Sequence, residues 1–293
     1  MFKKAIKGDG KARIMLALLA VYISWGSTYL AIKIALEDFP PFFMMGIRFL
    51  AVGGGLYLFL RIRGASAPDF SHWINATMIG GLLLFGGSAG VAYAEQWVSS
   101  GLASLMIATT PLWAVIFAGI WKHRASRFEW AGLMLGFAGV AVLNLETDLR
   151  THPVGSAALV IAAMSWAFGS VWSRRLKLPP GIMASAIEMV AGGALVLIVS
   201  LLSGERMTGT PGLYSIGAIL YLAVFGSLVG FIAYIYLLEK VRPALATSYA
   251  YVNPVIAVLL GVWFAGEEIT AKGISAMMII LTGVALVIIG QRD

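Results

Sequence analysis

The sequence predicts an all-α integral membrane protein whose ten transmembrane helices form two inverted five-helix repeats (5+5). Of the 293 residues, 60% are hydrophobic and only 12% are charged, about half the charged fraction of a typical soluble domain. The apolar residues come in runs of about 20, the length that crosses ~30 Å of hydrocarbon. The second half of the chain also repeats landmarks of the first half, roughly 140 residues later.

Charged or Pro/Gly-rich breaks divide the apolar runs into ten spans with short connections. Five spans in each copy is an odd number, so the second copy enters the membrane from the opposite side. We expect the first repeat in residues 1–147 and the second in 148–293. The expected spans are 14–36, 42–62, 73–94, 101–121, 128–146, 155–174, 181–203, 213–238, 244–265 and 270–290.

The distribution of basic residues predicts the orientation. If the N-terminus is cytoplasmic and the spans alternate, 16 of the 21 basic residues fall in cytoplasmic segments and four in outer segments. Lysine and arginine favour the cytoplasmic side of membrane proteins. We therefore expect a multi-pass membrane protein with both termini in the cytoplasm. The membrane also accounts for the net charge of +7, so we expect no nucleic-acid partner.

The matched landmarks of the two halves fall near the middle of their spans. Trp25 and Trp166 are central in the first and sixth spans, and Pro111 and Pro254 in the fourth and ninth. A proline within a helix kinks it and frees the carbonyl four residues earlier, which is that of Ile107 in the fourth span. The matched positions are Ser24-Trp25 with Ser165-Trp166, Pro40-Pro41 with Pro179-Pro180, Ile47-Arg48 with Ile187-Glu188, Gly86 and Gly90 with Gly226 and Gly230, and Thr110-Pro111 with Asn253-Pro254.

We expect a substrate cavity at this depth, between the repeats. Tryptophan prefers membrane interfaces, so a central tryptophan indicates a cavity wall. Small hydroxyl residues also pack helices together, and the glycine pair Gly86 and Gly90 is expected to serve packing. For Gly132 and Gly136, packing within the protein and a subunit interface are both open. The candidate cavity residues are Trp25, Thr28, Arg48, Thr110, Trp113, Trp166, Ser170, Glu188, Thr247, Tyr251 and Asn253, with helix kinks at Pro111 and Pro254.

Arg48 and Glu188 are charged residues within the spans, where a central charge costs at least ~2.5–3.5 kcal/mol. Inversion places Arg48 toward the outer surface and Glu188 toward the inner one, with about 10 Å of depth between their backbones. The two side chains could just bridge this gap; otherwise each faces water from its own end of the cavity. We hypothesise that Arg48 attracts a carboxylate and that Glu188 binds an ammonium group or a coupling proton. The alternative is that each snorkels or pairs locally.

Several chemistries find no support in the sequence. Cysteine is absent, which excludes disulfides, thiolate nucleophiles and cysteine metal sites. His72, His123 and His152 fall in separate predicted loops, so no metal site is expected. The sequence has no phosphate-binding loop and no catalytic constellation. We therefore expect no enzyme, no cofactor and no ATP-driven transport.

One set of motifs runs through nearly the whole chain. It comprises Trp25-Gly26-Ser27-Thr28-Tyr29, Arg48-Phe49, Pro111, Ser165-Trp166-Ala167, Ala246-Thr247-Ser248-Tyr249, Asn253-Pro254 and Gly266-Glu267. In order and spacing, these motifs resemble the drug/metabolite transporter superfamily, specifically its bacterial EamA-type exporters. The resemblance implies a basket-like 5+5 inverted-repeat fold that works by alternating access. It also implies export of amino acids, aromatic ones among them, or of related metabolites across the inner membrane.

The sequence leaves alternatives to such a secondary transporter. Its aromatic residues would also suit efflux of amphipathic cationic drugs, through cation–π contacts. A passive channel-like facilitator belongs to a different class and would show no saturation. A receptor would need a signalling domain, for which the short connections leave no room. The expected partners are a small-molecule substrate and the lipid bilayer; the substrate, coupling ion, direction and oligomeric state are open.

Overall fold

The computed structural model consists of helices, with no β-strand among the residues that it describes. These residues are 8–121, 125–143, 145, 150, 152–207, 209–241 and 248–290. A helix satisfies its own backbone hydrogen bonds, which is why apolar segments adopt it in a bilayer. The elements are α1 (Gly8–Gly26), α2 (Thr28–Ala35), α3 (Pro41–Ile62), α4 (Phe70–Gly80), the π-helix η1 (Gly81–Ala89), α5 (Gly90–Ala94), α6 (Ser100–Ile107), α7 (Thr110–Ala118), the 3-10 turn η2 (Gly119–Trp121), α8 (Arg127–Leu143), α10 (Pro153–Ser173), α11 (Ile182–Leu202), α12 (Leu213–Tyr221), the π-helix η3 (Leu222–Val229), α13 (Gly230–Lys240), α15 (Tyr249–Ala265) and α16 (Ala271–Gly290).

In the described part of the chain, eight helical segments are long and apolar enough to cross a membrane. Each coincides with a predicted span; Pro41–Ile62, for example, matches 42–62. The predicted fifth and ninth spans coincide with shorter helices, since α8 has 17 residues and the apolar part of α15 is Val252–Ala265. The all-helical membrane class is confirmed, whereas the ten inverted spans stay a prediction.

Glycines allow two pairs of helices to run together at close range, α3 with α11 and α8 with α16. A Cβ built on Gly53 would lie 2.6 Å from the Cβ of Met189, and one on Gly283 would lie 2.6 Å from the backbone nitrogen of Gly136. Each pair joins a helix from the first half of the chain to one from the second. Gly132 also faces the backbone of Gly283. The glycines of α8 therefore pack inside the protein, the first of the two possibilities that the sequence left open.

The first and fourth spans are interrupted near their centres. α1 and α2 are separated at Ser27, whose Oγ donates to the backbone oxygen of Ile23 at 2.5 Å. α6 and α7 are separated just before Pro111. Proline has no N–H to continue the hydrogen-bond ladder, so the helix breaks where the sequence predicted a kink.

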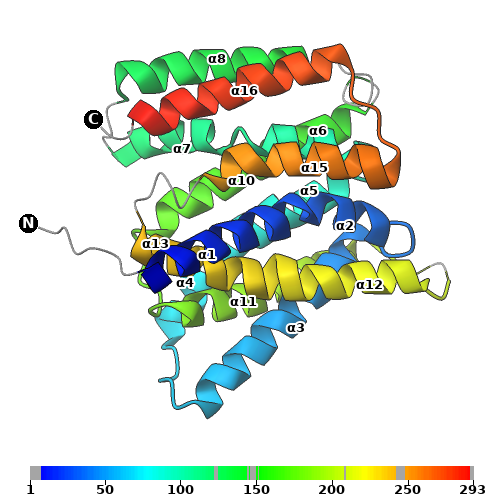
Figure 1. Cartoon of the computed structure of the whole chain (residues 1–293). Coiled ribbons are helices and arrows are strands. Elements are labelled where there is room, and N and C mark those ends of the chain that lie inside the picture. The colour runs from blue at the N-terminus through cyan, green and yellow to red at the C-terminus, as the bar shows by residue number, and fades with distance from the viewer. Residues whose placement is uncertain are drawn as a thin grey trace, which may run out of the picture.

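The bundle has two chemically different ends. α1 begins and α16 ends on the left of Figure 1, and we call this side the termini end. There, Asn75 Nδ2 donates to the backbone oxygen of Lys177 at 2.9 Å, and Ser126 Oγ donates to that of Gly290 at 3.3 Å. The turn after α2, the start of α12 and the α15–α16 turn lie on the right of Figure 1. We call this side the acidic end, because it contains Asp38, Glu95, Glu205 and Glu267.

Three carboxylates at the acidic end cap helices from distant parts of the chain. The N-terminus of a helix carries unpaired N–H groups and a partial positive charge, both of which favour a carboxylate. Because these bonds join segments far apart in sequence, they hold the acidic end closed. The bonds run to Asp38 from Gly212 N (2.9 Å) and Ser215 Oγ (2.6 Å), to Glu205 from Phe42 N (3.1 Å) and Phe43 N (2.8 Å), and to Glu267 from Ser100 N (2.7 Å), Ser100 Oγ (3.0 Å) and Gly101 N (3.1 Å).

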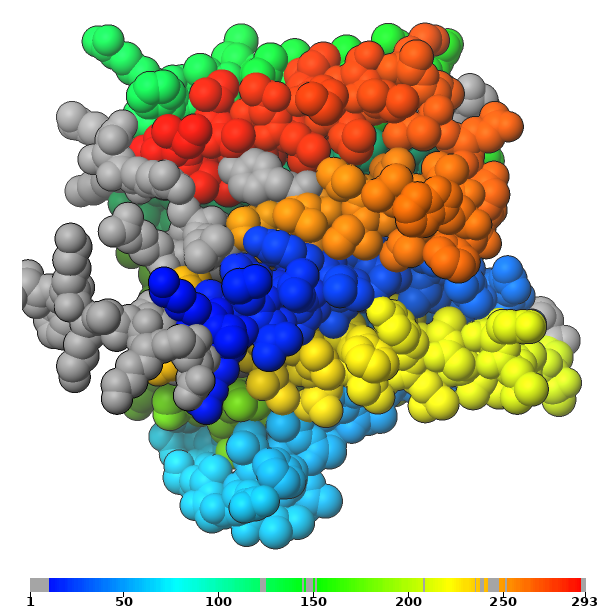
Figure 2. All heavy atoms as spheres, in the orientation of Figure 1, coloured from blue at the N-terminus to red at the C-terminus, as the bar shows by residue number. Residues whose placement is uncertain are grey.

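The exterior of the bundle suits a lipid environment. Figure 2 shows α16, α15, α1 and α12 as successive bands across one face. Large apolar side chains are exposed around the molecule, among them Leu213, Trp263 and Phe264. In water such a surface would be an aggregation hazard, whereas against lipid tails it costs nothing.

Candidate substrate site

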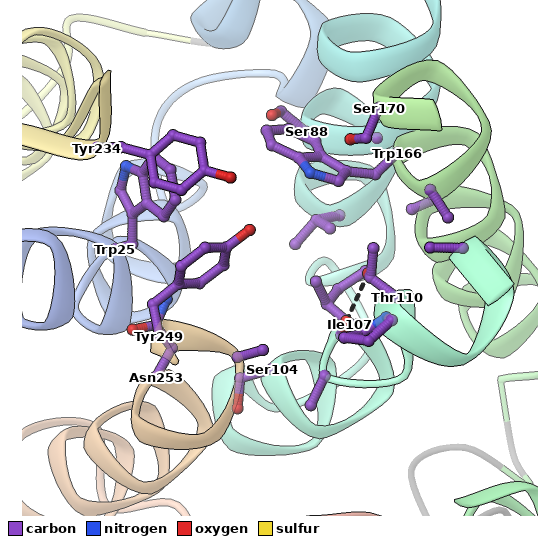
Figure 3. A pocket seen from close by; sticks show the side chains of 18 of the residues that line it. Trp25, Ser88, Ser104, Ile107, Thr110, Trp166, Ser170, Tyr234, Tyr249 and Asn253 are labelled. Carbon is purple, nitrogen blue, oxygen red and sulfur yellow. Dashed lines mark hydrogen bonds between the residues drawn. The ribbon is translucent and has the colours of Figure 1, made fainter. Parts of the chain in front are cut away.

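A cavity of about 960 Å³ lies between the central parts of the helices. Its volume is within the range of small-molecule sites, ~300–1,000 Å³. Both halves of the chain contribute to its lining, with Thr110 of α7 from the first half and Asn253 of α15 from the second. Figure 3 shows Trp25, Tyr234 and Tyr249 on one side of it and Ser88, Trp166 and Ser170 on the other.

An aromatic cluster forms one wall. The ring of Trp25 lies 4.8 Å from that of Tyr249, 5.1 Å from Tyr234 and 5.7 Å from Phe231, between ring centroids. Its Nε1 donates to the backbone oxygen of Gly226 at 3.1 Å, which fixes the orientation of the indole. Aromatic faces attract cationic groups and stack on flat solutes. This wall can therefore hold an ammonium group or an aromatic ring.

Trp166 is held on the facing wall by the glycines of η1. A Cβ on Gly87 would lie 2.8 Å from Cε3 of Trp166, so only glycine allows the indole to sit there. A Cβ on Gly86 would likewise collide with the side chain of Ser165. Ser165 Oγ donates to the backbone oxygen of Leu82 at 2.8 Å. Gly86 of the glycine pair thus packs the third span against α10, while the neighbouring Gly87 shapes the cavity.

The break in the fourth span lines the cavity with polar backbone. Pro111 leaves the Ile107 carbonyl without its helical donor. Thr110 Oγ1 donates to that carbonyl at 2.6 Å, as the dashed line in Figure 3 shows. The freed carbonyl predicted from the sequence is therefore satisfied within the protein.

Asn253, which precedes Pro254 in α15, has an unused acceptor at the cavity wall. The side chain is 7% exposed, and its Oδ1 has no hydrogen-bond partner among the described residues. Leaving a buried polar atom unpaired costs ~1–3 kcal/mol. Because the oxygen itself is buried, a solute with an N–H or O–H donor would recover that cost once the side chain turns toward the cavity.

Arg48 is 6% exposed and also lines the cavity. Its Nε donates to Ser227 Oγ at 2.9 Å, its Nη1 lies 3.6 Å from Met45 Sδ, and its guanidinium carbon is 4.9 Å from the Phe49 ring centroid. Among the described residues no carboxylate pairs with it, Glu188 included. A buried guanidinium without a counter-charge favours an anionic group from a bound solute.

The structure brings most of the predicted site residues together and leaves two outside. Trp113 packs edge-on against Phe137 of α8, with ring centroids 4.9 Å apart, and does not line the cavity. Glu188 does not line it either; its backbone oxygen lies where α11 meets Gly80 of α4. Thr247 is outside the described residues, as is the side chain of Tyr251. The predicted residues that do line the cavity are Trp25, Thr28, Arg48, Thr110, Pro111, Trp166, Ser170, Asn253 and Pro254.

Sequence reasoning missed several lining residues. Tyr234 lies toward the end of its predicted span, and Ser88 lies between the two glycines of the packing motif; both line the cavity. Ser104 comes from the turn of α6 before the proline break. A search for polar residues within one turn of the matched landmarks would have found Ser88, whereas Tyr234 depends on tertiary packing.

The mouth of the cavity is at the termini end. Arg174 and Arg175, which follow α10, line the cavity and are exposed. Trp121 at the end of η2 and Ile288 in the last turn of α16 also line it. The turns of the acidic end contribute no residue to the described lining. No group of three or more His, Asp or Glu side chains that could hold a metal ion occurs among the described residues.

Comparison with known proteins gives consistent matches over the full length. The EamA-like transporter family matches residues 12–145 and again residues 153–289. The chain is 45% identical over 276 residues to the uncharacterized inner membrane transporter YedA of Escherichia coli, covering 94% of this chain and 90% of YedA. It is 22% identical to the uncharacterized transporter YoaV of Bacillus subtilis (93% and 95% covered) and 25% identical to protein PagO of Salmonella typhimurium (96% and 95%). A solved crystal structure superposes with a TM-score of 0.66 at 21% identity, over 96% of this chain and 98% of that one, a likeness of fold alone.

Proposed function

Because the chain belongs to the EamA-like transporter family, we propose that it is a secondary transporter that exports amino acids, aromatic ones among them, or similar small metabolites by alternating access. The family and its named relatives point to a membrane transporter rather than an enzyme. The inner-membrane relative and the eight long apolar helices support a multi-pass protein of the inner membrane.

The observation that carries the proposal is the pair of unfilled binding groups in one cavity. In the described part of the chain, Arg48 has no carboxylate partner and Asn253 Oδ1 has no donor. An amino acid supplies both groups, its carboxylate for the guanidinium and its ammonium for the amide oxygen. The aromatic cluster around Trp25 adds a surface for the ammonium or for an aromatic side chain.

The way the two halves pack supports alternating access by inverted repeats. α1 packs on α13 and α15, and α10 packs on η1, α5 and α7. The first span of each half thus lies against the third and fourth spans of the other half. Such an exchange is expected of two repeats related by a two-fold axis in the membrane plane, with the substrate site at their interface.

The described opening supplies one of the two states that alternating access requires. The cavity opens at the termini end, which the basic residues assign to the cytoplasm. The described conformation would then be the one that loads substrate from inside the cell. Release would require the acidic end to open and the termini end to close.

Efflux of amphipathic cations is the second candidate, and the aromatic wall favours it. The buried guanidinium of Arg48 opposes it, because two positive charges would share a cavity of low dielectric constant. A counterflow assay in proteoliposomes separates the two. We expect labelled zwitterionic amino acids to accumulate against a trans load of the same compound, and quaternary ammonium compounds not to. Accumulation of the cations alone would overturn the proposal.

A further inference from the structure

Glu95 is a buried carboxylate that the cavity chemistry does not use. It follows α5, one residue beyond the membrane-crossing segment Phe70–Ala94, at the acidic end. Its side chain is 0% exposed, and neither Oε1 nor Oε2 has a hydrogen-bond partner among the described residues. The other three carboxylates that define this end all accept hydrogen bonds. Glu95 therefore has a different role from these capping carboxylates.

The groups around Glu95 do not neutralise it. Lys33 of α2 donates to the backbone oxygen of Glu95 at 3.0 Å, rather than to its carboxylate. Glu267, from the turn after α15, adds a negative charge that is committed to capping α6. Tyr29 of α2, which lines the cavity, lies within electrostatic reach of the carboxylate. From α10, the uncharged Gly155 packs here, and the titratable His152 before the helix stacks on the Trp97 ring, with ring centroids 6.5 Å apart.

An ionised carboxylate with no hydrogen bond is far too costly to bury, so such a group takes up a proton instead. Burial raises the pKa of the Glu95 carboxyl well above its ordinary value; the charge of Lys33 opposes this rise and that of Glu267 adds to it. In the closed acidic end, the neutral acid is the form that fits. Hydration on opening would return the carboxyl toward its ordinary behaviour.

We propose that Glu95 is a proton-binding site in the closure of the acidic end. Its carboxyl group holds a proton while this end is closed; when the end opens, the O–H bond breaks, the electron pair stays on the carboxylate and water on that side takes the proton. This inference rests on the alternating access proposed above. It makes opening toward the acidic end a proton-releasing step.

The sign of the pH effect follows from linkage. Glu95 binds its proton more tightly in the closed state, so acid favours closure. The closed state keeps its full advantage below the ordinary carboxyl pKa of about 4.3. This advantage is lost as pH rises through the higher pKa of the closed state. In total, the equilibrium constant between closed and open states changes by about tenfold for each unit by which the two pKa values differ.

Accessibility of one cavity thiol tests the proposal. The chain has no cysteine, so Ser88→Cys gives a single reporter in the cavity wall. Spheroplasts and inverted vesicles present the two ends of the protein to a membrane-impermeant maleimide between pH 5 and 8. The thiolate is the form that reacts with the maleimide, and its fraction rises with pH. Each labelling rate is therefore divided by the labelling rate of the unfolded protein at the same pH. From the acidic end, we expect labelling to rise at least tenfold with pH, and Glu95→Gln to abolish that rise and hold the rate low.

Matched variants fix the interpretation. Glu37→Gln removes an exposed carboxylate near the same end and should keep the full rise. Lys33→Gln removes the charge that opposes proton uptake and should move the rise to higher pH, which tests the proposal even if Glu95→Gln does not assemble. A pH-independent rate in the parent, or a rise that persists in Glu95→Gln, would overturn the proton site. No labelling from the acidic end under any condition would instead contradict alternating access.

Discussion

Two side chains in the cavity wall have hydrogen-bonding capacity that the described residues do not use. The guanidinium of Arg48 has five N–H donors, of which Nε meets Ser227 and Nη1 meets only the thioether of Met45. The amide oxygen of Asn253 has no partner in the described chain. Unfilled donors and acceptors in one cavity are costly in the free protein and favourable in a complex, which is a pattern typical of a binding site.

Arg48→Gln should raise KM for an amino acid by about 10- to 100-fold, because one charge-assisted hydrogen bond contributes about 1.5–3 kcal/mol. Uptake of the labelled substrate into proteoliposomes measures it. Arg63→Gln, at the exposed end of the same helix, serves as the control and should leave KM unchanged. An unchanged KM in Arg48→Gln would remove this residue from the site.

Asn253→Leu separates binding from folding. The leucine side chain has a similar size and replaces a buried, unpartnered amide oxygen, so the thermal midpoint Tm in detergent should stay equal or rise. Affinity for the ammonium group should fall, with KM up by about tenfold. A lower Tm together with an unchanged KM would show that Asn253 stabilises the fold and does not bind the substrate.

The hydrogen bonds of Asp38 predict a pH dependence of stability whose sign is opposite to that of the Glu95 effect on closure. Hydrogen bonds from the Ser215 hydroxyl and the Gly212 N–H lower the pKa of the Asp38 carboxyl. Its stabilising contribution is present above the ordinary pKa and is lost as pH falls through the lowered one. The Tm of Asp38→Asn should thus lie below that of the parent at neutral pH, and the difference should shrink in acid. A difference that is constant with pH would contradict the cap.

At the scale of helices, close packing depends on where glycine lies. Gly53 and Gly54 are neighbours in α3, but a Cβ on Gly53 would meet the Met189 Cβ and the Val190 backbone nitrogen at 2.6 and 2.7 Å, whereas one on Gly54 would meet nothing within 4 Å. The same chemical change therefore has opposite consequences at adjacent positions.

Gly53→Ala should separate α3 from α11 and destabilise the protein by about 1–3 kcal/mol. Gly54→Ala should be neutral or stabilising by up to about 1 kcal/mol, since alanine favours the helix. The Tm values of the two variants are compared by heating each in detergent and measuring the fraction of protein that remains monodisperse. Equal Tm values would show that the two helices do not pack as described.

The sequence predicts the elements better than it predicts their faces. Length and hydropathy predict the eight long apolar helices of the described chain, and Pro111 predicts the break in the fourth span. Thr110 and Trp113 are nearly one turn apart, yet Thr110 faces the cavity and Trp113 packs on Phe137. Which side of a uniformly apolar helix faces inward is decided by neighbouring helices, because lipid and protein interior are similarly apolar.

At the scale of the molecule, the repeat predicts position but not chemistry. The repeat places Glu188 where Arg48 stands in the first half, which suggested a shared role at the cavity. Arg48 lines the cavity, whereas Glu188 lies outside it, where α11 crosses α4 at Gly80. The sequence repeat aligns positions of the two halves, while each half has its own side-chain contacts. The buried Glu95, in a turn between spans, gave no signal in the sequence.

The central claim is that a single cavity carries a solute by opening to one side at a time. Trans-stimulation tests it most directly: proteoliposomes are loaded with a labelled amino acid, and its efflux is timed with and without the same unlabelled amino acid outside. The account predicts that efflux saturates with internal concentration and is accelerated by the external amino acid, because a loaded carrier returns faster than an empty one. Efflux that grows linearly with concentration and ignores the external solute would contradict it and indicate a channel.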